Sequence, residues 1–217
     1  MSGWKTFFST YGASLRQAIL IHLGYVLVSV AVGFFLGLML GILLSRLPRR
    51  WSGMLLPVLS IFQTIPGIVF IGLLYLALGM VPGAVIIALA VYATFPVLKN
   101  TYTGLQQVES SYKEAARGCG MSPVQVLWKV ELPLAMPTII AGLRMSTIYT
   151  VSWAVLASMI GLGGLGDFIY QGVASNNNLL IIAGAIPAAV MAVVLGAVVD
   201  RLQKRVVPRG LRKEAGR

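Results

Sequence analysis

Apolar stretches of membrane-spanning length are the feature that most constrains how this chain can fold. A helix that crosses the hydrocarbon core of a bilayer needs about 20 predominantly apolar residues. Stretches that meet or approach this length occupy residues 19–44, 55–78, 82–98, 134–160 and 179–199. Because lipid offers no hydrogen bonds to the backbone, each span must be a helix. We therefore predict an all-α membrane bundle of about five transmembrane helices.

The composition favours the same class of protein. Hydrophobic residues make up 58% of the 217 residues and charged residues only 11%, whereas about a quarter of a soluble domain is charged. In a soluble protein the net charge of +11 would suggest a nucleic-acid ligand. Here the basic residues cluster at the ends of apolar spans, so we predict lipid contact and no nucleic-acid partner. The single cysteine, Cys119, excludes an internal disulfide, and no metal-ligand spacing occurs.

The distribution of Lys and Arg predicts the orientation in the membrane. These residues follow the first span, populate the loop at residues 100–133 and crowd the C-terminal tail at 201–217, whereas residues 80–81 and 161–178 have none. The positive-inside rule then places the loop and the tail in the cytoplasm and the N-terminus outside. Lys5 and Arg16 depart from this bias, so we expect residues 1–18 to form an interfacial segment before the transmembrane domain of residues 19–200.

Prolines and glycines punctuate the spans. A proline within a span removes a backbone donor and bends the helix, which favours a bundle around a pathway over a simple anchor. The prolines in question are Pro57, Pro66, Pro96, Pro137 and Pro187. Gly33, Gly37 and Gly41 recur every four residues on the first span and offer a smooth face for another helix. That helix belongs either to this chain or to a second copy.

A polar insertion at residues 111–133 interrupts the apolar chain. Ser111 and Glu114 fit a capping box, and Gly120 suits a left-handed helix end. Ser122 and Gln125 fit a second box. We therefore predict two short helices joined by a sharp turn.

The second of these helices is expected to stop at Leu132, because the residue before Pro133 avoids helical geometry. Such short helices need support from elsewhere. Ala115 and Ala116 form a small surface with Arg117 beside it, which suits a groove on a cytoplasmic protein. A solvated loop without a partner is the alternative.

The insertion resembles the signature of permease subunits of bacterial ABC importers. "EAA" at Glu114–Ala116, Gly120 after three residues, and "VELP" at Val130–Pro133 after nine more reproduce its spacing. The family usually has Ile where Val130 stands. The resemblance covers residues 20–200 and implies a type I importer fold. It also implies that the coupling residues Glu114, Ala115, Ala116, Arg117, Gly120, Leu132 and Pro133 engage an ATPase.

Other segments are similar to permeases for osmoprotectants. These are "QTIPG" at residues 63–67 and "IGLGGLGDFIYQG" at 160–172. The resemblance implies quaternary ammonium solutes such as glycine betaine, choline or carnitine, with methionine permeases as a close competitor. The chain lacks a P-loop, so ATP and Mg²⁺ are expected on a separate cytoplasmic ATPase and no cofactor on this chain. The family further implies a second permease, either a copy or a paralogue, and an extracytoplasmic solute-binding protein.

The candidate pathway residues are polar or aromatic side chains at membrane depth. Each of them also suits a packing role. They are Gln63, Thr64, Pro66, Tyr149 and Trp153. The outer gate or binding-protein contact is expected at Gly163, Gly164, Gly166 and Asp167, although Asp167 also suits the first turn of a helix.

Two further side chains have less specific roles. We expect His22 to form hydrogen bonds at the outer interface and Arg144 to reach the cytoplasmic one.

Two other classes of protein compete with the importer subunit. A stand-alone channel or secondary carrier would move solute without an ATPase, although carriers are often built from inverted repeats, which are not detectable here. An intramembrane enzyme would need a nucleophile with a base, or paired acids, within the spans. We identify no such group and predict neither catalytic residues nor a metal.

Overall fold

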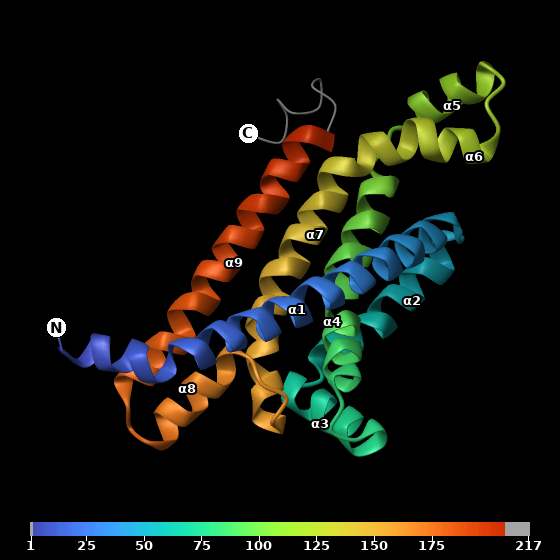
Figure 1. Ribbon diagram of the computed structural model, residues 1–217. Coiled ribbons are helices and arrows are strands. Elements are labelled where there is room, and N and C mark those ends of the chain that lie inside the picture. Colours follow the sequence, from blue (N-terminus) through green and yellow to red (C-terminus); the bar gives the residue numbers. More distant parts are fainter. Residues whose placement is uncertain (1, 207–217) are drawn as a thin grey trace.

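The computed structural model describes residues 2–206, and within this range every regular element is a helix (Figure 1). Four helices are long and apolar enough to cross a membrane, and a bent pair makes a fifth crossing if it counts as one span. The prediction of an all-α bundle with about five spans is therefore confirmed. The last basic residues of the tail, 207–217, lie outside the described residues.

The first helix, α1, is longer than predicted. It runs without interruption over Ser2–Arg46. At 1.5 Å per residue its 45 residues extend about 67 Å, roughly twice the thickness of a hydrocarbon core. Residues 2–18 are thus no separate element, because this segment contains no proline and its glycines do not interrupt the helix. Their location at the membrane surface stays a prediction.

The second span is broken where the sequence places Pro66. Helix α2 (Arg49–Ile61) continues into a 3₁₀ turn, η1 (Phe62–Thr64), and α3 (Gly67–Leu78) then leaves at an angle of 85°. Gly79, with φ of 82°, follows the last residue of α3, at the end of the predicted span of residues 55–78. Pro66 is the only one of the five span prolines at a break; the others lie inside helices that continue past them.

Helix α4 (Pro82–Gln106) extends eight residues beyond the predicted span. The predicted span ends at residue 98, but Lys99 and Asn100 after it do not end the helix. Asn100 donates from Nδ2 to the Pro96 carbonyl at 2.7 Å, one turn back, while Lys99 is exposed. Polar residues mark the edge of the apolar span here without breaking the helix.

The predicted stop at Leu132–Pro133 is also wrong. Helix α5 (Ser110–Gly118) is followed by α6 (Pro123–Val126), a π-helical turn η2 (Leu127–Glu131) and α7 (Leu132–Ala154) in direct succession. Pro133 falls in the first turn of α7, where its missing N–H is tolerated. The wider π turn before it accommodates the ring, and Leu132 donates to the Leu127 carbonyl five residues back.

The remaining elements close the opposite end of the bundle. Helix α7 ends in a 3₁₀ segment, η3 (Val155–Ile160), and a glycine-rich turn leads to α8 (Leu165–Ala174) and then to α9 (Asn178–Val206). Helices α4, α7 and α9 lie side by side in Figure 1, and α1 crosses over them. The α5–α6 hairpin and α8 are at opposite ends of this row.

Close contact between α1 and α4 depends on the three spaced glycines. A Cβ on Gly37 would lie 2.6 Å from the Thr94 carbonyl oxygen. Equivalent atoms on Gly33 and Gly41 would lie 2.5 Å from Cβ atoms on α4. The glycine face therefore packs within the chain, which was the first of the two predicted uses.

Candidate translocation pathway and coupling site

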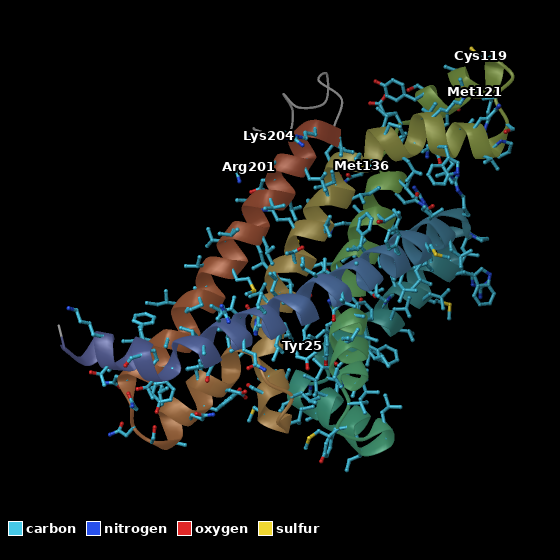
Figure 2. All side chains as sticks on the ribbon, in the orientation of Figure 1. Tyr25, Cys119, Met121, Met136, Arg201 and Lys204 are labelled. Carbon is cyan, nitrogen blue, oxygen red and sulfur yellow. The ribbon has the colours of Figure 1, made fainter. Side chains whose placement is uncertain are left out.

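The α5–α6 hairpin (residues 110–131) projects beyond the bundle, with Cys119 and Met121 at its tip (Figure 2). Gly120 has φ of 79°, Met121 donates to the Ala116 carbonyl at 3.2 Å, and Gly120 donates to the Arg117 carbonyl at 2.9 Å. These two bonds make a Schellman motif. The predicted left-handed end at Gly120 is confirmed, and it sets the sharp turn between the two helices.

One of the two predicted capping boxes exists. Gln125 donates its backbone N–H to Ser122 Oγ at 3.3 Å, and Ser122 donates its own to Gln125 Oε1 at 2.8 Å. The box at Ser111 is absent, because α5 begins two residues earlier than predicted, with Glu109 at the N-cap position. Ser111 Oγ instead donates to the Glu109 carboxylate at 3.2 Å.

The predicted coupling residues divide into an exposed group and a buried group. Glu114, Ala115, Arg117 and Gly120 are exposed on the hairpin, whereas Ala116 is buried and packs inside it. Leu132 is buried and Pro133 half-buried at the start of α7. The surface that the predicted coupling residues could offer to a partner is therefore smaller than the motif. The hairpin also leaves Tyr112, Val124 and Trp128 more than half exposed, at 53%, 64% and 64%.

A buried carboxylate fixes the hairpin to the bundle. Glu131 is 2% exposed and accepts two hydrogen bonds from the Arg46 guanidinium at the end of α1; one of them, from Nη1 to Oε1, measures 3.3 Å. Lys113 Nζ on α5 lies 3.7 Å from Glu131 Oε1. One side chain thus joins α1, α5 and the π turn. No sequence pattern predicts this role for Glu131, because its main partner is 85 residues away.

The predicted pathway residues partly converge. Gln63, Tyr149 and Trp153 line a pocket of about 300 Å³ together with Tyr92 and Thr150. Gln63 also lines a second pocket of about 260 Å³ between α2 and α4, which reaches Lys99 and Tyr102. Gln63 therefore lines both pockets.

Thr64 and Pro66 shape the helix break and do not line these pockets. Thr64 Oγ1 donates to the Ile61 carbonyl at 2.7 Å, and Pro66 precedes α3 as its N-cap residue.

Tyr92 was missed by the sequence analysis, and it secures the helix break. Its hydroxyl donates to the Ile65 carbonyl at 2.7 Å, and its ring stacks on Trp153 with centroids 4.3 Å apart. A Cβ on Gly67 would lie 1.9 Å from the Trp153 ring. Gly67 is therefore needed for α3 to begin against this aromatic pair.

The predicted outer residues form a tight turn onto α8. Gly163 and Gly164 have φ of 79° and 109°, and a Cβ on Gly166 would lie 2.0 Å from Ser158 Oγ. Asp167 lies in the first turn of α8, where an acid is favoured, and burial raises the pKa of its carboxyl. The glycines thus have a structural role, and Asp167 is half-buried beside a cavity.

His22 has a different environment from the one predicted. It is fully buried, accepts from the Leu165 N–H at Nδ1 and therefore carries its proton on Nε2, which donates to the Val151 carbonyl at 3.0 Å. It joins α1 to α7 and to the start of α8 inside the bundle.

Arg144 likewise differs from its predicted role. The prediction was that its side chain extends to the cytoplasmic interface. In the structure it forms an ion pair with Asp200 on α9, with Nε 2.8 Å from Oδ1. Within residues 2–206 no three His, Cys, Asp or Glu side chains are grouped to hold a metal ion.

Both a protein-family model and individual relatives match most of this chain. Residues 33–212 match the family model described as "Binding-protein-dependent transport system inner membrane component". The choline transport system permease protein OpuBB of Bacillus subtilis is 36% identical over 207 residues, covering 95% of each chain. The carnitine transport permease protein OpuCB of Listeria monocytogenes is 37% identical over 215 residues, covering 98% of this chain and 97% of that protein.

A solved structure has the same fold. The MetNI methionine ABC transporter, in an inward-facing conformation, contains a chain that superposes with a TM-score of 0.80. The identity is 23%, and the alignment covers 89% of this chain and 96% of the other.

Proposed function

The chain belongs to the family of binding-protein-dependent transport system inner membrane components, and we propose that the solute it passes is a quaternary ammonium osmoprotectant. It is a multi-pass permease subunit of an ABC importer in the bacterial inner membrane and a transport component, not an enzyme. Choline, glycine betaine and carnitine are the solutes named for its relatives. They share a trimethylammonium group, which is the chemistry that the pathway must accept.

The observation that carries the mechanism is the anchored α5–α6 hairpin. Its exposed side, with Glu114, Ala115 and Arg117, docks in a groove of a separate cytoplasmic ATPase that holds ATP and Mg²⁺. Its base is fixed to α1 through Glu131 and is continuous with α7. Movement of the ATPase is therefore passed to the membrane helices, and Gly120, Ala116, Leu132 and Pro133 maintain the shape that transmits it.

The remaining partners follow from the same scheme. The hairpin faces the cytoplasm, as do Arg201 and Lys204 at the same end of the bundle (Figure 2), and the N-terminus lies outside. Tyr149 is 49% exposed, so a second permease, a copy or a paralogue, completes the pathway on that side. A solute-binding protein delivers the solute at the end where α8 lies.

The aromatic pocket supports the choice of solute. A quaternary ammonium group has no N–H to donate and is bound through aromatic faces. Tyr92, Tyr149 and Trp153 supply rings along the pocket, and Gln63 and Thr150 supply neutral polar groups. This lining passes a cationic head group without holding it by an ion pair.

Reconstituted transport tests the proposal. Proteoliposomes that contain the permease, its ATPase and its binding protein should accumulate choline, glycine betaine or carnitine only with ATP inside the compartment that the ATPase faces. Methionine is the matched negative solute. Solute flux through the permease alone would identify a stand-alone channel or carrier, and ATP-driven uptake of methionine but of none of the three would refute the assigned solute.

Variants in the hairpin test the coupling residues separately. Glu114→Gln should lower uptake at least tenfold while the protein still inserts and purifies normally. Glu109→Gln, one turn away and outside the proposed docking surface, is the matched control. Equal uptake by both variants would show that Glu114 does not contact the ATPase.

A further inference from the structure

A cavity of about 350 Å³ lies between the first half of α1 and the start of α8. It is at the end of the bundle opposite to the hairpin (Figure 1). Its lining includes Tyr11, Ser14, Gln17, Asp167, Phe168 and Gln171. This volume is within the range of small-ligand sites, and the cavity shares no lining residue with the pocket at Trp153 that the proposed pathway uses.

The cavity contains a carboxylate without a cationic partner. Within residues 2–206, no Lys, Arg or His forms an ion pair with Asp167. Of the other acids in this range, Glu114 and Glu131 belong to the hairpin, and Glu109 directly precedes it. Asp200 is the neighbour of Arg201, which lies at the hairpin end of the bundle (Figure 2). Asp167 therefore supplies the one negative side chain at this end, and its half-buried position limits screening by water.

Aromatic rings stand beside this carboxylate. Tyr11 and Phe168 both line the cavity, and their rings meet edge to face with centroids 6.4 Å apart. Tyr11 is 36% exposed, whereas Phe168 is buried at 7%. The Tyr11 ring is thus held by its neighbour and still reaches the opening.

This combination selects one chemical class of ligand. A small metal cation would need several oxygen ligands in a closed shell, and only one carboxylate is present. A quaternary ammonium group needs no hydrogen-bond acceptors and is attracted by a ring face and a nearby negative charge. The neutral amides of Gln17 and Gln171 suit the uncharged remainder of such a molecule.

We propose that this cavity is an outer binding site for quaternary ammonium cations, in which Asp167 and Tyr11 hold the head group before it reaches the membrane pathway. The inference rests on the proposed function for its biological ligand. It adds a preference within the solute class, because choline carries a net positive charge whereas glycine betaine and carnitine also carry a carboxylate. Asp167 attracts the first and repels the carboxylate of the others.

Binding of tetramethylammonium to the purified permease tests the site without transport. Isothermal titration should show saturable binding to the unmodified chain, on the order of tenfold weaker binding to Asp167→Asn, and recovery in Asp167→Glu. Tyr11→Leu should also weaken binding. Glu109→Gln removes one negative charge at the far end of the molecule and should leave binding unchanged. Equal affinity for the unmodified chain and Asp167→Asn, or no saturable binding, would overturn the site.

Transport by the complete importer then tests the preference. Asp167→Asn should lower the ratio of choline to glycine betaine uptake several-fold at limiting solute concentration. An equal loss for both solutes would make Asp167 a contact of the binding protein or a gate and would overturn the cation preference. If the importer moves neither solute while tetramethylammonium still binds through Asp167, the proposed function fails and the site stands.

Discussion

Replacing Arg46 with methionine should destabilise this protein more than replacing its acidic partner, Glu131. The reason is the difference in burial, since the Glu131 side chain is 2% exposed and the Arg46 side chain 45%. In Arg46→Met the carboxylate stays buried with only Lys113 nearby, at 3.7 Å. Leaving a buried charge without its partner costs about 3–5 kcal/mol, and the remaining lysine places the expected loss near the lower end, about 3 kcal/mol.

The reverse substitution leaves a milder defect. In Glu131→Gln the amide oxygen still accepts from Arg46, and both cations are partly exposed, at 45% and 25%. The expected loss is about 1 kcal/mol. The double variant should lose little more than Glu131→Gln alone, because the buried charge is gone in both.

Thermal unfolding of the purified permease in detergent measures these differences. For a chain of this size 1 kcal/mol corresponds to about 2–4 °C, so Arg46→Met should lower Tm by about 6–12 °C and Glu131→Gln by about 2–4 °C. Arg50→Met, an exposed basic residue just beyond α1, is the control and should change Tm little. A Glu131→Gln loss equal to or larger than that of Arg46→Met, or additive losses in the double variant, would refute the argument.

Matched glycine substitutions test three other contacts. Gly37→Ala should cost about 1–3 kcal/mol in thermal unfolding, because its Cβ would lie 2.6 Å from a carbonyl oxygen of α4; an unchanged Tm would contradict this contact. Gly67→Ala should displace the Trp153 ring and lower solute uptake at least tenfold. The control Gly72→Ala, on the same helix, places its Cβ within 4 Å of no other atom and should transport normally. Equal uptake by the two variants would show that the contact between Gly67 and Trp153 is not needed for transport. Gly120→Ala should destabilise the hairpin by about 1 kcal/mol through its positive φ, and Gly118→Ala should not; hydrogen exchange of residues 110–126 separates the two.

Features governed by neighbouring residues were predicted well from the sequence. These features are the apolar spans, the break at Pro66 and the caps at Gly120 and Ser122, each of which depends on a few consecutive residues. Backbone geometry and hydropathy decide such features locally. The error at Ser111 is also local, because Glu109 and the two serines after it compete for the same cap position and the helix begins two residues earlier than predicted.

Features that depend on distant residues were not predictable in this way. Glu131 finds Arg46, Tyr92 holds the Ile65 carbonyl, and His22 bonds to Val151, 129 residues further along the chain. No local pattern specifies these partners. Three of the five predicted pathway residues follow the same rule. Gln63 in η1 lines one pocket with Tyr149 and Trp153 in α7, because both elements contact α4.

The continuity of the helix through Pro133 has a mechanical consequence. A helix break at Leu132 would have let the hairpin move relative to the membrane helices without moving them. Instead, residues 123–160 form one helical run, with the π turn in place of a break. The same run carries the hairpin's second helix at one end and Trp153 near the other. Because Trp153 contacts Gly67 at the start of α3, a shift of the hairpin along this run bears directly on the broken span that borders the proposed pathway.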